Sequence, residues 1–270
     1  MATRDPHTAR RQHPAAGTPG WSDDGVSRTV RELWDRKSWS YDRSSTHNPS
    51  AAIEVAAWNA ALHRLLPPPP AKVLDVGAGT GFLSLLLAGQ GHRVTAVDLS
   101  EHMLARLEQK AAQAGLSIRT VVGDAAAPPG AGFDAVVERH VIWTLPRPLE
   151  ALEAWHAAAP GGRLVLFSAQ WGRANGILQP ARGRARALLR SLRREGPADD
   201  TRYGSALRAQ LPFAHGTAPE DLIDLVDGAG WGPPRVERLL DLDWAARRAA
   251  PTLLDRLVGA PPRFAVVAGS

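Results

Sequence analysis

The chain of 270 residues contains no cysteine, which excludes a disulfide framework, a cysteine-ligated zinc or iron–sulfur site, and a thiol nucleophile. It also lacks a long apolar run: the longest stretch, around residues 83–88, is far shorter than the roughly 20 residues that a membrane-spanning helix needs. The amino-terminal segment carries charge but no apolar core, so it does not read as a secretory signal. We therefore expect a cytoplasmic protein without a membrane partner.

Lysine is scarce: three of the 32 basic side chains are lysines, and the others are arginines. A GC-rich genome produces the same bias, and the formal net charge of +5 is spread along the chain. A modest net charge bears on solubility and steering, not on fold. One arginine-dense stretch, residues 182–194, either steers an anionic substrate or forms the solvated face of a helix. We predict no nucleic-acid partner.

Strand and helix patterns alternate through the middle of the chain. Short apolar runs predict five strands, at residues 72–76, 93–97, 117–122, 133–137 and 163–167. Three-to-four-residue apolar periodicity predicts helices between them, at residues 82–88, 101–114 (with Ser100 as its N-cap) and 149–158. Strands separated by helices imply right-handed crossovers, so the sequence predicts a doubly wound α/β fold with a mostly parallel sheet.

The flanking segments complete a four-part organisation. Residues 1–24 read as a disordered tail, because they are small, polar and interrupted by proline and glycine. Residues 25–169 hold two N-terminal helices and the sheet core. Residues 170–217 have no strand pattern and are predicted to form a helical insertion after the fifth strand. Residues 218–270 complete the core with a helix (219–228), a strand (236–240), a helix (245–257) and a last strand (263–268).

The strongest local signal is the run VLDVGAGTG at residues 73–81. Glycines after a strand let the backbone approach a ligand closely, and the following helix presents free amides to an anionic group. The dinucleotide fingerprint needs glycines at its first, third and sixth positions, but the sixth position from Gly77 is Phe82. A pyrophosphate cradle is therefore the weaker interpretation.

Carboxylates occur near the ends of the first three predicted strands. Asp98 follows the second strand, where an acid can accept hydrogen bonds from two ribose hydroxyls, and Asp124 follows the third. Asp75 precedes the glycine loop. In open α/β sheets, ligands bind outside the carboxyl ends of the strands. Three acids without a nearby arginine favour an adenosine that carries a positive group.

An ordered set of motifs makes the prediction specific: VLDVGAGTG, VTAVDLS, GDAAAPP, FDAVVERHVIWTLPRP and PGGRLVL, followed by the closing strand RFAVVA. In this order and spacing they resemble the Rossmann-type (class I) S-adenosylmethionine-dependent methyltransferases, in the small-molecule branch related to quinone-biosynthesis methyltransferases. The resemblance implies a seven-stranded sheet whose last strand is antiparallel. It also implies S-adenosylmethionine as cofactor and methyl transfer to an oxygen or nitrogen of a small molecule, which we expect to be a secondary metabolite.

The resemblance implies a role for each matching residue. The loop Gly77, Ala78, Gly79 and Gly81 would hold the methionine portion of the cofactor, with Asp75 at its amino group and Glu138 facing the same end. Asp98 would bind the ribose, Leu99 and Met103 would flank the adenine, and Asp124, backed by Ala125, would accept from the adenine amino group. Tyr41 would close over the cofactor. Asp75 could instead be a turn-capping acid, and Tyr41 an ordinary surface or core aromatic.

Methyl transfer from a sulfonium needs positioning more than a metal, and the histidines have no metal-ligand spacing, so we predict none. A base is useful if the acceptor arrives protonated. His140 is the best-placed candidate. A second is His215 in the insertion at residues 170–217, which the resemblance makes a helical substrate lid. Trp34, Trp39, Trp143, Tyr203 and the two histidines are predicted to line the substrate pocket, although the tryptophans could equally pack in the core and His140 could bond a neighbouring backbone group.

Three other readings stay open at the sequence level. One is a nicotinamide-dependent oxidoreductase on a related fold. Another is a cyclase or scaffold that binds S-adenosylmethionine without transferring a methyl group. An RNA methyltransferase is the third, but the N/D-P-P-Y/F type tetrapeptide that handles amines is missing. We expect a small-molecule substrate and a monomer or homodimer.

Overall fold

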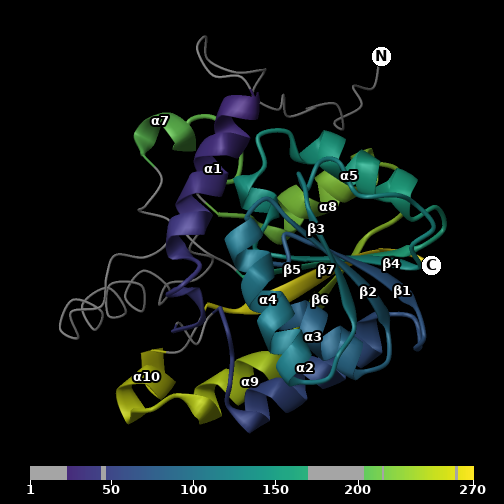
Figure 1. Cartoon of the computed structure of the whole chain (residues 1–270). Helices are drawn as coiled ribbons and strands as arrows, with labels where there is room; N and C mark the ends of the chain where they lie inside the picture. The colour runs from purple at the N-terminus through teal and green to yellow at the C-terminus, as the bar shows by residue number, and fades with distance from the viewer. Residues whose placement is uncertain (1–22, 44–46, 170–203, 215, 259–260) are drawn as a thin grey trace, which may run out of the picture.

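The computed structural model describes residues 23–43, 47–169, 204–214, 216–258 and 261–270. At its centre is a seven-stranded sheet in the order β3-β2-β1-β4-β5-β7-β6 (Figure 1). The strands are β1 (Lys72–Val76), β2 (Arg93–Asp98), β3 (Ile118–Val122), β4 (Ala135–Arg139), β5 (Arg163–Ala169), β6 (Arg235–Arg238) and β7 (Arg263–Gly269). The first five pair in parallel, whereas β7 is antiparallel to both β5 and β6. The predicted doubly wound sheet with an antiparallel last strand is confirmed.

The central strands are apolar on both faces because helices cover both faces. β1, β4 and β5 consist almost entirely of buried residues, whereas the edge strand β3 is only partly buried. In the register of the sheet, Val76 of β1 pairs with Val97 of β2 and Glu138 of β4. The carboxyl ends of these strands therefore meet at one edge, where the loops that follow them lie together.

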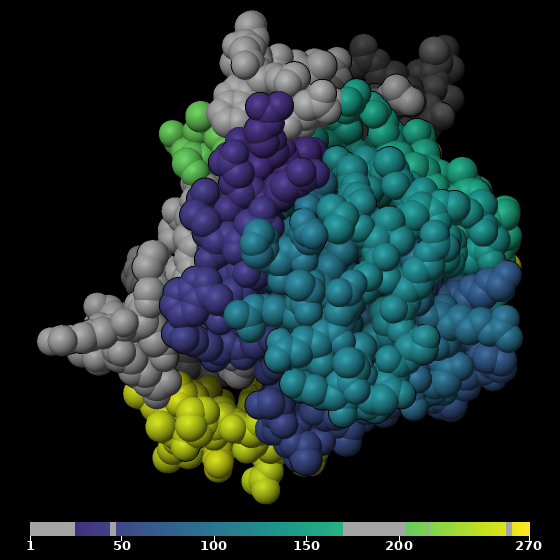
Figure 2. Space-filling model, viewed as in Figure 1, coloured from purple at the N-terminus to yellow at the C-terminus, as the bar shows by residue number. Residues whose placement is uncertain are grey.

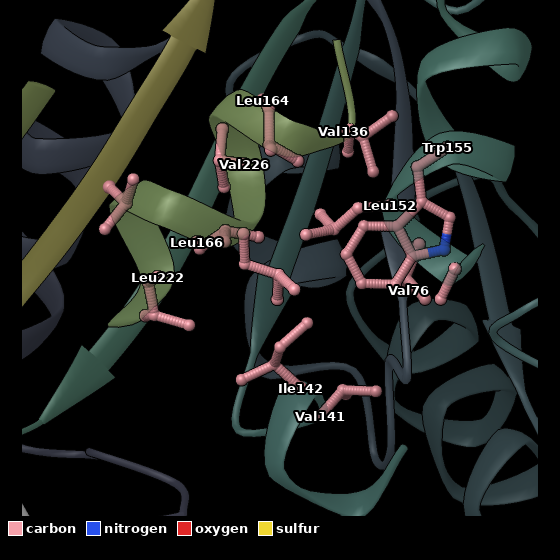
Figure 3. Close-up of a cluster of buried hydrophobic side chains, with 14 of the residues drawn as sticks. Val76, Val136, Val141, Ile142, Leu152, Trp155, Leu164, Leu166, Leu222 and Val226 are labelled. Carbon is pink, nitrogen blue, oxygen red and sulfur yellow. The ribbon is translucent and has the colours of Figure 1, made fainter. Parts of the chain in front are cut away.

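Helices α5 (Pro148–Ala158) and α8 (Pro219–Gly228) cover one face of the sheet. Trp155 and Leu152 of α5 and Leu222 and Val226 of α8 pack onto Val136 and its neighbours on the strands (Figure 3). The opposite face is covered by α2 (Ala52–Leu65), α3 (Phe82–Gly89), α4 (Glu101–Gln113) and α9 (Leu240–Ala249). These two apolar layers hold the sheet between them, so the strand ends are rigidly placed.

Helix α1 (Asp23–Lys37) lies across the carboxyl edge of the sheet, and α7 (Ser205–Arg208) lies beside it (Figure 1). Val26 and Val30 of α1 pack with Leu207 and Leu211 from the α7 segment, and Leu99 lies against this cluster. In the space-filling view, α1 rests directly on the surface formed by α4 and its neighbours (Figure 2). The N-terminal helix is thus part of the folded body and covers the edge where a ligand would bind.

Several predicted boundaries differ from the structure. The helix expected at 245–257 is divided into α9 and α10 (Leu253–Val258), because Pro251 holds the preceding Ala250 in an extended conformation. Helix α1 begins at Asp23, inside the predicted tail. β4 lies two residues later than predicted, which places Glu138 and Arg139 within the strand. Ser100 caps α4 as predicted, its hydroxyl accepting from the amide of Met103.

Most of the predicted lid, residues 170–217, lies outside the described residues, and so does most of the predicted tail. Within the described ranges, no helix combines the length and the apolar character that spanning a membrane requires.

Candidate functional site

The glycine loop between β1 and α3 cannot carry side chains at two of its positions. Gly77 and Gly81 have φ values of +63° and +87°, in the left-handed region that favours glycine. A Cβ atom at Gly77 would overlap Val141, and one at Gly81 would overlap Leu107. At these two positions the loop is therefore bare backbone packed against a buried side chain, and α3 begins directly after the loop.

Asp98, at the end of β2, fastens this loop to the neighbouring strand. Its Oδ2 accepts from the Gly79 amide at 2.8 Å, and its Oδ1 accepts from the Ser100 amide at 2.9 Å. Burial raises the pKa of Asp98 to about 6, although the two amides partly oppose the shift. The acid predicted to bind the ribose is thus held rigidly at the same edge as the glycine loop.

Asp75 and Glu138 are both buried but face opposite sides of the sheet. Asp75 is 2% exposed and accepts from the Ser84 hydroxyl at 2.5 Å, and burial raises its pKa to about 7. Glu138 is fully buried on the side of α5 and α8, where its Oε2 accepts from the Val141 amide at 2.7 Å. Burial also raises the pKa of Glu138 to about 7, and its Oε1 has no partner among the described residues.

An open pocket lies beside the glycine loop. The residues lining it are Tyr41, His47, Asp75, Gly77, Ala78, Thr80, Phe82, Leu83, Arg139 and His140. Glu138, which was predicted to face this end of the cofactor, does not line the pocket. Side chains alternate along a strand, and that of Glu138 points under the loop that follows β4. His140 has a φ of +68° and is the one non-glycine residue with positive φ in the described ranges. Such strained backbone clusters at functional sites.

Arg139 contradicts the expectation that no arginine lies near the acids. Its guanidinium carbon lies 5.0 Å from the ring centre of Trp58 and 4.5 Å from that of Phe82, and its Nη1 donates to the His47 carbonyl at 3.0 Å. Burial lowers its pKa to about 10. The sequence predicts that this strand ends at Val137, which leaves Arg139 outside it. In the structure the strand ends at Arg139, and this places the residue at the ligand-binding edge of the sheet.

The predicted Tyr41 lies in a 3₁₀ turn, Tyr41–Arg43, against the glycine loop. A Cβ atom at Gly79 would find the Tyr41 ring 3.8 Å away, and the ring stacks on His47 with centroids 4.2 Å apart. Asp42, which the sequence did not single out, anchors the turn: it accepts from the Thr80 hydroxyl at 2.5 Å and from Lys110 Nζ at 3.1 Å. Two residues that are distant in sequence thus hold Tyr41 in place.

The other end of the site is covered by α1. Asp124 Oδ2 accepts from the Ser27 hydroxyl of α1 at 3.0 Å, and Asp124 Oδ1 accepts from the Ala126 amide at 2.9 Å. Leu99 packs against the α1 cluster, and Met103 is only 2% exposed. Leu99 and Asp124, two of the residues predicted to surround the adenine, therefore lie against α1, whereas Ala125 packs in the core cluster beside Trp155.

The predicted substrate-pocket residues are scattered. Trp34 meets the Tyr41 ring edge-on with centroids 5.7 Å apart, and Trp143 packs against two apolar clusters. Trp39 is 58% exposed and lies under the Arg43 guanidinium. Tyr203 and His215 lie outside the described residues. In the described part of the chain, no group of three or more histidine, aspartate or glutamate side chains is placed to hold a metal ion.

Comparisons with known proteins find methyltransferases among the proteins that this chain resembles. Residues 73–162 match the family model for a methyltransferase domain. The ubiquinone biosynthesis O-methyltransferase of Xylella fastidiosa (strain 9a5c) is 35% identical over 100 residues, which cover 36% of this chain and 41% of that protein. The chain covers 54% of the length of other curated relatives, at 30% identity over 154 residues. It thus spans about half the length of the curated relatives it matches.

Two solved structures share the fold over nearly the whole chain. The 1,6-didemethyltoxoflavin-N1-methyltransferase of Burkholderia thailandensis, with its substrate and S-adenosylhomocysteine bound, has a TM-score of 0.57 at 19% identity and covers 94% of this chain and 93% of its own. The cyclase SpnF has a TM-score of 0.58 at 16% identity, covering 90% of this chain and 96% of its own. The match of residues 73–162 to a methyltransferase-domain model, the seven-stranded sheet and the fold shared with these structures agree with the class I S-adenosylmethionine-dependent methyltransferase fold that the strand-end motifs resemble.

Proposed function

We propose that this protein binds S-adenosylmethionine at the carboxyl edge of its sheet and transfers the methyl group to an oxygen or nitrogen of a small molecule. The observation that carries the proposal is the bond from the Gly79 amide to Asp98, because it joins the bare glycine loop to the acid at the end of the next strand. The relatives named above support a small-molecule acceptor, since two of them are named as methyltransferases of ubiquinone biosynthesis and of didemethyltoxoflavin. A secondary metabolite is the acceptor class that we propose.

The residues present fit this cofactor. Glycine at positions 77 and 81 lets the loop pack against Val141 and Leu107, and Gly77 and Ala78 of this loop line the pocket together with Asp75. Asp98 would hold the ribose and Asp75 the amino group of the methionine portion, while Asp124 under α1 would meet the adenine. When bound, the cofactor supplies a methyl group already activated by the positive sulfonium.

The chain's own residues would position the cofactor and the acceptor and exclude water from the site. Tyr41, anchored through Asp42, covers the loop side of the site, and α1 covers the adenine side. Holding two reacting groups in line accounts for much of the acceleration in such a displacement. The predicted cytoplasmic location and the monomeric or dimeric state stay predictions.

Calorimetry with the full-length protein tests the cofactor assignment. We expect S-adenosylmethionine and S-adenosylhomocysteine to bind and NADH to bind far more weakly; tighter binding of NADH would contradict the proposal. A labelled methyl donor, offered with a panel of phenols and amines, then tests transfer. The protein could bind the cofactor and convert a substrate without any labelled methyl group appearing in the product. That result would support the cyclase or scaffold interpretation instead.

We predict that Asp98→Ala weakens binding of S-adenosylhomocysteine by about 10- to 100-fold, because a hydrogen bond to a charged group contributes about 1.5–3 kcal/mol. The carboxylate also organises Gly79 and Ser100, so its loss loosens the loop as well. Asp227→Ala, an exposed acid on α8, is the matched control and should leave the affinity unchanged.

The pH dependence gives a second measurement of the same residue. An ionised Asp98 would accept from the ribose hydroxyls, and its pKa of about 6 means that the carboxyl group is mostly protonated at pH 5 and ionised at pH 8. The affinity of the wild-type protein should therefore rise between these values, and Asp98→Asn should lose that part of the rise. Unchanged affinity in Asp98→Ala would refute the placement of the ribose.

A further inference from the structure

Glu138 is the penultimate residue of β4, and its fully buried side chain points under the loop that follows the strand. Its Oε2 accepts from the Val141 amide at 2.7 Å and from the Ile142 amide at 3.4 Å. Its Oε1 has no hydrogen-bond partner among the described residues. Within the described ranges, the carboxyl group of Glu138 therefore forms its hydrogen bonds with the backbone of this loop alone.

The loop turns sharply and then begins a short helix. His140, the first residue after the strand, has a φ of +68°, and Val141 is the N-cap of the 3₁₀ helix η2 (Ile142–Thr144). The first amides of a helix have no partner within it, and a valine side chain cannot accept from them. The Glu138 carboxyl group supplies the missing acceptor. Its hydrogen bonds therefore bridge His140, because they join the strand before this residue to the helix after it.

The left-handed backbone of His140 is the feature that this bridge can fix. A residue with a Cβ atom is strained in that region, and the strain persists only where surrounding contacts determine the conformation. With the loop amides held by Glu138, the His140 side chain lines the pocket. Without an acceptor at position 138, we expect the backbone to relax toward negative φ, which would turn the imidazole out of the pocket wall.

We propose that Glu138 is a positioning residue, whose side-chain oxygen fixes the turn at His140 and so holds the imidazole in the pocket. This inference rests on the proposed function, with His140 as the base that takes a proton from the acceptor. The property required at position 138 is a hydrogen-bond acceptor and not a negative charge, since a carboxamide oxygen also accepts from amides. Burial and the nearby Asp75 raise the pKa of Glu138 to about 7, so a neutral side chain is compatible with this position.

Two replacements in the full-length protein separate an acceptor from its absence. Glu138→Met keeps the length of the side chain and suits an apolar layer, but its sulfur is a weak acceptor. With the acceptor identified in the labelled-methyl screen, Glu138→Met should lower kcat about tenfold, and Glu138→Gln should recover most of that loss. Glu153→Met, at an exposed acid on α5, is the matched control.

A double variant shows whether Glu138 acts through His140. In the His140→Asn background, adding Glu138→Met should change turnover by less than about twofold, because the group that Glu138 positions is already gone. A general loosening of the site would lower turnover again in the double variant and would overturn the proposal. Loosening of the Val141 side chain against Gly77 would instead weaken the binding of S-adenosylhomocysteine, which we expect to be unchanged in Glu138→Met.

A measurement on the His140 ring needs neither an acceptor nor turnover. In nuclear magnetic resonance spectra of protein with ¹⁵N-labelled histidine, the ring signal of His140 is the one that His140→Asn lacks. Glu138→Met should shift this signal, and Glu138→Gln should leave it near its wild-type position. If Glu138→Met does not fold, Glu138→Asp takes its place with the same expectation, because it keeps the carboxylate but withdraws it from the amides.

Three results would overturn the proposal. One is a ring signal that stays unchanged in Glu138→Met, and another is equal turnover in Glu138→Met and the wild type. The third is an equal loss of turnover in Glu138→Gln and Glu138→Met, because an acceptor at this position would then not be the property that counts. Failure of the wild type to bind S-adenosylhomocysteine would instead refute the proposed function, whereas the ring signal of His140 tests the positioning by Glu138 in either case.

Discussion

Trp155→Ala should lower the free energy of unfolding by about 3–5 kcal/mol, the range for large-to-small changes at buried aromatic residues. Trp155 is fully buried and lies beside Leu152 and Val76 in the layer between α5 and the sheet (Figure 3). Its indole nitrogen donates to the Ala125 carbonyl at 2.6 Å. The substitution leaves a cavity and an unpaired carbonyl next to Asp124, so it damages both the core and the adenine end of the proposed site.

Urea denaturation followed by circular dichroism measures this loss. Trp155→Phe keeps most of the buried volume and removes the hydrogen bond, so we expect a smaller loss of about 1–3 kcal/mol. Trp39→Ala, at a side chain 58% exposed, should change stability by about 0.5 kcal/mol or less. A loss in Trp155→Ala no larger than that in Trp39→Ala would contradict the packing described for α5.

His140→Asn should lower turnover by about 10²- to 10⁴-fold if His140 is the base that takes a proton from the acceptor. Asparagine is the informative replacement because it tolerates the left-handed backbone that His140 adopts, at a φ of +68°. The side chain lines the pocket beside Arg139, next to the proposed position of the methionine portion. The affinity for S-adenosylhomocysteine should stay the same, since the proposed role concerns the acceptor.

The measurement is the rate of S-adenosylhomocysteine formation with the acceptor identified in the screen. His63→Asn, an exposed histidine on α2, controls for a general effect of removing an imidazole. Equal turnover in His140→Asn and the wild type would remove His140 from the role of base. A fall in both turnover and cofactor affinity would instead point to a disturbed loop.

Local physics determined most of the fold. A buried parallel strand needs apolar residues on both faces, so runs such as Lys72–Val76 and Arg93–Asp98 could be recognised within a residue of their observed ends. The glycine loop was equally recognisable, because only glycine accepts a left-handed backbone at position 77 with Val141 packed against it. The position of Asp98 followed from topology, since parallel strands end at a common edge.

Boundaries were less well determined, because they depend on competing contacts. The end of β4 was predicted at Val137, but pairing with β5 continues to Arg139 opposite Phe167. That extension turns Glu138 toward α5 and α8 and brings Arg139 to the pocket. Successive side chains of a strand face opposite sides of the sheet. An error in the predicted end of a strand therefore changes which side chains are expected at the site.

By itself, then, the sequence determined the α/β alternation, the glycine loop and the acids at the strand ends, because each depends on neighbours in the chain. Only the tertiary structure decided which distant residues complete the site. Asp42 anchors Tyr41 through Thr80 and Lys110, and Ser27 reaches Asp124 across 97 positions of sequence. Arg139 is held by Trp58 and Phe82 from two different helices. The physical reason is that side-chain contacts of this kind depend on how helices pack on the sheet, which no local pattern specifies.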